Sequence, residues 1–126
     1  MRAGIAGTRP AATRHYIKHA APMKYIDPTQ VSPSNYRELF RRGSVRVVEM
    51  RLPAGESDIE HSHPFEMVYF IRGGRARVHV GSDSVDLEIP DGHVMQHEPW
   101  THRVENIGNT EIEAILVEFF DTHPNA

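Results

Sequence analysis

The chain has 126 residues, enough for about one compact domain, and its 39% hydrophobic and 25% charged residues are typical of globular proteins. Its net charge of -3 argues against nucleic-acid binding, and no apolar run reaches the ~18 residues of a membrane-spanning helix, so we expect neither nucleic acid nor a membrane as a partner. The absence of cysteine excludes disulfides and thiolate chemistry and suits a reducing compartment, so we expect a cytoplasmic protein.

The first 26 residues carry five basic side chains and no acidic one. They lack the apolar core of a secretory signal. We interpret residues 1–22 as a flexible basic tail, or as the product of an upstream start codon with Met23 as the natural first residue. Residues 23–126 would then form a single domain.

The elements of this domain are predicted mainly by turn residues at short spacing. Asn35 and Glu38 have capping-box spacing, which predicts a short helix at Asn35–Arg42. Beyond residue 43, Gly, Pro, Asn and Asp separate short segments that are rich in Val, Ile, Tyr and Phe. These segments are Val45–Leu52, Met67–Arg72, Arg75–Val80, Val85–Ile89, His93–His97, His102–Ile107 and Glu111–Phe120. Many short strands at a spacing of about 8–12 residues predict an antiparallel sandwich or small barrel.

Two short stretches of this domain concentrate histidine. His61 and His63 are two residues apart, so on a strand their rings project from the same face. Two neutral imidazoles side by side are typical of a transition-metal site, although single strand histidines often have only a structural role. His102, which follows a turn containing proline and opens a strand, is the best candidate for a third ligand.

The spacing around these histidines forms two motifs. The first motif consists of Gly55, five further residues, His61-Ser62-His63, the segment Pro64-Phe65-Glu66-Met67 and then Gly73-Gly74. The second motif runs from Pro99 through His102 to Asn106, and its turn contains no glycine. Their order resembles the cupin superfamily. The resemblance implies an all-β fold, a cupin (double-stranded β-helix, or jelly-roll) barrel of antiparallel strands over about residues 35–122. It also implies a metal site inside the barrel, with His61, His63 and His102 as ligands.

One position departs from the family pattern. Without a gap, the family's metal-binding glutamate falls on Met67, and Glu66 lies one residue early. On a continuous strand Met67 would share a face with the histidines and Glu66 would point away, unless a bulge near Pro64 turned Glu66 inward as a fourth ligand. We favour three histidines alone. Cupins without the glutamate resemble thiol and diketone dioxygenases, which use iron.

The same alternation places further residues near the site. Met67 and Tyr69 are expected to form a pocket wall, and Trp100 either lines the mouth of the pocket or anchors a loop. His97 is either a group that supports a metal ligand or a surface histidine. Glu118 shares a strand face with apolar residues, so it is either a buried pocket carboxylate or a charge at a strand end.

The resemblance favours a metal-dependent, dioxygenase-like enzyme that acts on a small organic molecule. The cofactor would be a divalent metal ion, iron in our reading, with Zn, Ni, Mn or Cu as alternatives. Two other functions stay open: a non-catalytic cupin that binds or senses a small molecule, and a sugar-type isomerase or epimerase that pairs His102 with Tyr69 or Glu118. The segment Glu111–Phe120 is apolar on both faces, which leads us to expect a homodimer.

Overall fold

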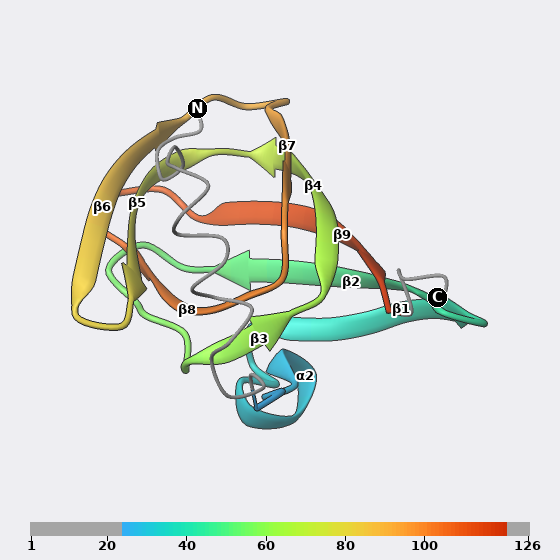
Figure 1. The fold of residues 1–126 in the computed structure, drawn as a ribbon. Helices are drawn as coiled ribbons and strands as arrows, with labels where there is room; N and C mark the ends of the chain where they lie inside the picture. The colour runs from blue at the N-terminus through green and yellow to red at the C-terminus, as the bar shows by residue number, and fades with distance from the viewer. Residues whose placement is uncertain (1–23, 121–126) are drawn as a thin grey trace.

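A computed structural model describes residues 24–120, and these form two antiparallel β-sheets that face each other (Figure 1). The first sheet has five strands in the order β1-β2-β9-β4-β7, and the second has four in the order β3-β8-β5-β6. The elements are α2 (Pro28–Val31), β1 (Tyr36–Arg42), β2 (Val45–Leu52), β3 (His61–His63), β4 (Phe65–Arg72), β5 (Gly74–Val80), β6 (Asp83–Ile89), β7 (Val94–His97), β8 (Trp100–Asn106) and β9 (Ile112–Phe119).

The seven strand segments predicted from the sequence are confirmed, and Val45–Leu52 has the predicted bounds. The predicted helix at Asn35–Arg42 is wrong, because β1 occupies Tyr36–Arg42 and pairs with β2. The capping signal is overridden by tertiary pairing: Tyr36 is buried opposite Met50, and Gly43, at a φ of 58°, forms the tight turn of this hairpin.

The apolar core lies between the two sheets. Alternate residues of β2 and β9 are buried there, and the fully extended pairing of these two strands keeps the alternation in step over eight residues. Burying one such Val, Leu or Ile side chain is worth about 1.5–3 kcal/mol. The core cluster contains Tyr36, Val48, Met50, Leu52, Val68, Phe70, Ala76, Val104, Ile112, Ala114 and Leu116.

The chain changes sheets twice in the region that matters most for function. At Pro64 it leaves β3, in the four-stranded sheet, and enters β4, in the five-stranded sheet. At Gly73 it returns to the four-stranded sheet, and a side chain there would clash with the carbonyl oxygen of Ile89. The odd-numbered histidines of β3 point into the barrel, and this odd-numbered pattern therefore does not continue into β4.

The residues before β1 pack on the barrel. Ser62 N donates to Ile26 O at 2.6 Å, and Ile26 N donates to Ser62 Oγ at 3.0 Å. Asp27 caps α2 by accepting from Thr29 N. The predicted tail, residues 1–22, lies outside the described residues. In the described part of the chain no helix is long and apolar enough to cross a membrane.

Candidate metal centre

Three histidines from two neighbouring strands meet inside the barrel. β3 pairs with β8 so that His61 lies opposite His102, and His63 shares the face of His61. The ring centroids are 4.7 Å apart for His61 and His63, 4.8 Å for His61 and His102, and 5.2 Å for His63 and His102. All three side chains are buried, and one nitrogen from each lies within 4.8 Å of the others. The structure thus brings together the three histidines that the motifs singled out.

The hydrogen bonds of these rings leave nitrogen atoms free for a metal ion. His61 Nδ1 donates to Ile59 O at 2.6 Å, and His63 Nδ1 donates to Glu118 Oε2 at 2.6 Å. His61 Nε2 and both nitrogens of His102 are buried without a hydrogen-bond partner among the described residues. Buried polar atoms are normally paired, so this cluster of unpaired nitrogens fits a metal ion as the missing partner.

The electrostatics of the site favour the neutral form of two of the imidazoles, those of His61 and His102, and the neutral form is the one that binds metal. Burial, aided by the neighbouring His63, lowers the pKa of His61 to about 3. Burial likewise lowers the pKa of His102 well below its usual value. Burial alone would also lower the pKa of His63, but the carboxylates of Glu66 and Glu118 raise it. The negative charge of the site therefore collects around His63.

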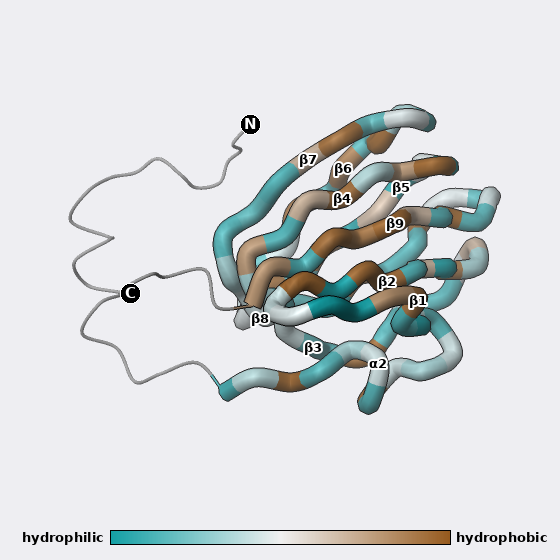
Figure 2. Tube along the Cα trace, turned by 90° about the vertical axis from the view of Figure 1, so that its right-hand side faces the viewer, coloured by the Kyte–Doolittle hydropathy of each residue, from teal (hydrophilic) through white to brown (hydrophobic). Residues whose placement is uncertain are grey.

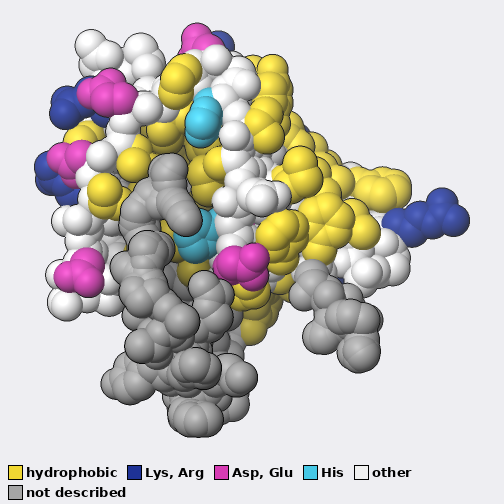
Figure 3. Space-filling view, turned by 45° about the horizontal axis from the view of Figure 1, so that its top comes forward, with side chains coloured by type: hydrophobic (Ala, Val, Ile, Leu, Met, Phe, Trp, Pro, Cys, Tyr) yellow, Lys and Arg dark blue, Asp and Glu magenta, His cyan; other side chains and the backbone are white. Residues whose placement is uncertain are grey.

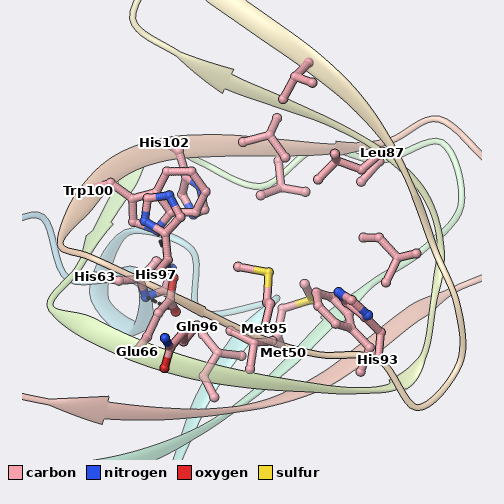
Figure 4. A pocket seen from close by; sticks show the side chains of 18 of the residues that line it. Met50, His63, Glu66, Leu87, His93, Met95, Gln96, His97, Trp100 and His102 are labelled. Carbon is pink, nitrogen blue, oxygen red and sulfur yellow. Dashed lines mark hydrogen bonds and ion pairs between the residues drawn. The ribbon is translucent and has the colours of Figure 1, made fainter. Parts of the chain in front are cut away.

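Glu66 points into the barrel beside the histidines (Figure 4). It is 2% exposed, and its Oε1 lies 3.5 Å from His63 Nδ1. Its Oε2 accepts from Trp100 Nε1 at 2.8 Å, whereas Oε1 has no partner among residues 24–120. Burial raises the pKa of this carboxyl group. Glu66 thus points inward with a free oxygen, and it groups with His63 and Glu118, whereas His61, His63 and His102 form a group of their own. The expectation that Glu66 points away, on which the preference for three histidines alone depended, is wrong.

The expected positions of Met67 and Tyr69 are wrong. Both lie on the outer face of the five-stranded sheet, 41% and 48% exposed, and neither lines the cavity. The prediction assumed that residues 61–71 form one strand whose odd-numbered side chains all point inward. The chain instead changes sheets at Pro64. After the crossover it is Glu66, together with Val68 and the even-numbered positions, that faces inward.

Trp100 and His97 lie next to Glu66. The two rings stack with centroids 3.4 Å apart and 16° between their planes, and Trp100 lies 4.1 Å from the ring of His102. Both line the cavity, which for Trp100 is one of the two roles considered from the sequence. His97 lies opposite Glu66 in the β4–β7 register, but its Nδ1 donates to Glu98 O. It therefore contacts the site through its stacking with Trp100.

The site opens onto one end of a cavity of about 1330 Å³ inside the barrel. Figure 4 shows His63, Glu66, Trp100 and His102 gathered at that end and His93 at the other, with Met50 and Met95 between them. Most of the lining is aliphatic or aromatic, and among the described residues no Lys or Arg contributes to it. Such a space suits a small, largely apolar molecule with one polar group that reaches the metal.

Two buried charged residues near the site, Asp58 and Arg46, were not predicted from the sequence. Asp58 accepts from Tyr36 Oη at 2.7 Å and from Val104 N at 2.7 Å, and burial raises its pKa to about 6. Arg46 is fully buried and binds Glu118. Arg46 lies on the same inward face of β2 as Val48 and Met50. This alternation could have predicted a buried ion pair, because a charged residue on an inward face requires a buried partner.

Comparison with known proteins supports the same architecture. A scan against protein-family models finds no match, and a search of curated proteins finds no matching sequence. Among solved structures, a cupin domain from Bordetella pertussis is 22% identical, with a TM-score of 0.62 over 78% of this chain and 98% of that one.

Two further solved structures extend the comparison. An RmlC-like cupin with a double-stranded β-helix fold from Methanocaldococcus jannaschii is 17% identical, with a TM-score of 0.56 over 72% of this chain and 84% of that one. A Cupin 2 conserved barrel domain protein from Salinispora arenicola is 18% identical, with a TM-score of 0.55 over 82% and 92%. At these identities the likeness concerns the fold, and together with the strand topology above it shows that this chain has the double-stranded β-helix fold of the cupins, as its motifs implied.

Proposed function

We propose that this protein is a metal-dependent, dioxygenase-like enzyme that acts on a small, largely apolar organic molecule. One observation carries the proposal: buried nitrogen atoms of His61 and His102 have no partner among the described residues, and beside them His63 and the free oxygen of Glu66 lie at one end of an apolar cavity. Together they offer three imidazoles and one carboxylate. This donor set suits divalent iron, and also Mn, Ni, Zn or Cu to different degrees. With Glu66 among the donors, the dioxygenase-like chemistry is supported by the metal site and the apolar cavity, and no longer by the likeness to dioxygenases that lack the glutamate.

The four ligands and their neighbours would divide the work of the site. A bound divalent iron would supply Lewis acidity and oxygen chemistry, with coordination positions left for oxygen and substrate. Trp100 holds one oxygen of Glu66 through its indole N–H, which leaves the other oxygen free beside His63. Val68, Phe70 and Leu116 on the cavity wall exclude water and contact the apolar part of the substrate.

The cavity also indicates the charge of the substrate. No cationic side chain of the described residues lines it, whereas Asp83, Glu88 and Glu98 contribute to its lining. A multiply anionic substrate would therefore find no counter-charge other than the metal. We expect a neutral or singly charged molecule whose donor group binds directly to the metal.

The first test of this function is metal content followed by oxygen consumption. Protein purified without added metal and then loaded with Fe²⁺ should contain about one ion per chain and consume oxygen with a suitable thiol, diketone or small acid from a panel. Trp100 is the only tryptophan and hydrogen-bonds Glu66, so metal binding should also change its fluorescence. Metal and ligand binding without turnover would favour the non-catalytic binding protein. Absence of any metal binding would refute the proposal.

We also propose that the protein forms a homodimer through the outer face of the five-stranded sheet. Figure 2 looks onto this sheet, and hydrophobic side chains gather on the same side of the molecule in Figure 3. Phe40, Tyr69 and Met67 are 54%, 48% and 41% exposed there, around half-buried Val117. Ion pairs such as Arg51–Glu113 border the face and offer both signs of charge to a second copy.

Light scattering after size exclusion should therefore give the mass of two chains. Tyr69→Arg places a charge on the exposed apolar face and should convert the dimer to a monomer without changing metal content. Ile59→Arg is the matched control, because Ile59 is 55% exposed but belongs to neither sheet. A wild-type protein that stays monomeric at high micromolar concentration would contradict this assembly.

A further inference from the structure

Glu118 and Glu66 both lie beside His63, but their surroundings differ. Glu118 is fully buried on β9, between Arg46 on β2 and Glu66 on β4, in one row across the sheet. Its Oε1 accepts from Arg46 Nε at 2.9 Å and lies 2.8 Å from Arg46 Nη2, and its Oε2 accepts from His63 Nδ1 at 2.6 Å. Both oxygens of Glu118 are thus engaged, whereas Glu66 keeps one oxygen free.

We propose that Glu118, held in place by Arg46, is a positioning residue that orients His63 for metal binding and is not itself a ligand. This inference rests on the metal site proposed above. An ionised carboxylate can only accept hydrogen bonds, so the proton shared with His63 belongs to Nδ1. The lone pair of the ring then lies on Nε2, and the hydrogen bond fixes the plane in which it points.

Arg46 makes Glu118 a poor ligand and a rigid support. Its guanidinium is 1% exposed and also donates to Asp27, from Nη1 to Oδ2 at 3.2 Å and from Nη2 to Oδ1 at 3.1 Å. Nη2 donates in addition to Tyr25 Oη at 3.2 Å. The cation neutralises Glu118 and anchors it to the segment that precedes α2. A metal ion that recruited Glu118 would have to displace either the hydrogen bond and ion pair with Arg46 at Oε1 or the hydrogen bond from His63 at Oε2.

The test measures the Kd for Zn²⁺ and Co²⁺ by chelator competition in the full chain, its variants and a control. Glu118→Ala should weaken binding about 10–100-fold, the range seen when groups supporting a metal ligand are removed. Glu118→Gln should lose less, because its amide oxygen can still accept from His63 Nδ1. The matched control is Glu113→Gln, on the same strand but outward and paired with Arg51, and it should bind metal normally.

Two spectroscopic measurements separate positioning from ligation. The visible spectrum of bound Co²⁺ should keep its form in Glu118→Ala, because the ligand set is unchanged. Nitrogen NMR of the metal-free wild type, at a pH high enough for His63 to be neutral, should show this ring protonated on Nδ1 alone, and the variant should show a mixture of tautomers. The NMR result tests the role of Glu118 even if the wild type binds no metal, in which case the proposed function fails separately.

Glu118→Ala leaves Arg46 partly unpaired and could therefore misfold. A double variant keeps the proposal testable in that case. Arg46→Met combined with Glu118→Leu replaces the buried pair by apolar groups of similar size, an exchange that barrels and cores often tolerate. It should fold and still bind metal about 10–100-fold more weakly. Unchanged affinity in Glu118→Ala and in the double variant would overturn the proposal. A Co²⁺ spectrum with a lost ligand would also overturn it, in favour of Glu118 as a ligand.

Discussion

Replacing His102 by phenylalanine should abolish stoichiometric metal binding and raise the stability of the metal-free protein. Both ring nitrogens of His102 are buried without a partner in the described part of the chain, and each such group costs about 1–3 kcal/mol. Phenylalanine has no polar atom to bury, and the adjacent cavity leaves room for its larger ring. Denaturant unfolding of the metal-free proteins should show an increase of about 1 kcal/mol or more in the free energy of unfolding.

Addition of metal should make the wild type more stable than His102→Phe. At a free metal concentration of 100 times Kd, linkage stabilises the wild type by about 2.7 kcal/mol and leaves His102→Phe unchanged. His79→Phe serves as the control, since His79 pairs with Glu105 at the surface of β5 and should respond to metal like the wild type. Full metal content in His102→Phe, or a metal-free variant that is less stable than the wild type, would show that His102 has another role.

The fold could be predicted largely from local sequence because most strands are short, alternate regularly and end at turn residues. Val45–Leu52 is the best example: its alternation persists because β1 and β9 pair with it on both sides. The segment Asn35–Arg42 could not be assigned this way. Its strand state comes from pairing with β2, and a local capping signal does not contain that information.

The candidate site was predictable where it depends on a single strand and not where it depends on crossing between sheets. His61 and His63 share a face because they are two residues apart on β3, and His102 lies opposite them through the β3–β8 register. Glu66 belongs to the other sheet. Because the chain changes sheets at Pro64, even-numbered residues point inward after it. Counting alternate positions from His63 along one continuous strand would wrongly place Met67 inside.

The polar support of the site was only partly readable from the sequence. Glu118 shares its face with Ile112, Ala114 and Leu116, and this parity already indicated a buried carboxylate as one alternative. Its partners, Arg46 and His63, are far away in the sequence and reach it from β2 and β3. Long-range polar pairs of this kind depend on strand order, which alternation within each strand does not fix.

Glu66→Gln should weaken the binding of divalent metals by more than about 100-fold, beyond the range typical of groups that only support a ligand. The variant keeps an oxygen that can accept from Trp100 Nε1, but it loses the anionic oxygen that faces the histidines. Because burial raises the pKa of Glu66, a neutral amide should be tolerated, and the metal-free protein should unfold at the same denaturant concentration or higher. Chelator competition and denaturant unfolding measure the two effects.

Met67→Glu is the decisive comparison, because it introduces a carboxylate at the position where the unbroken spacing of the family motif would place one. Met67 is 41% exposed on the outer face of β4, so the new carboxylate should point to solvent and leave both metal content and affinity as in the wild type. The opposite pattern, tighter metal binding in Met67→Glu and little change in Glu66→Gln, would mean that β4 keeps the parity of β3 through Pro64. The site would then hold three histidines only, because Glu66 would face away from the metal and Met67 is a weak ligand for iron or manganese.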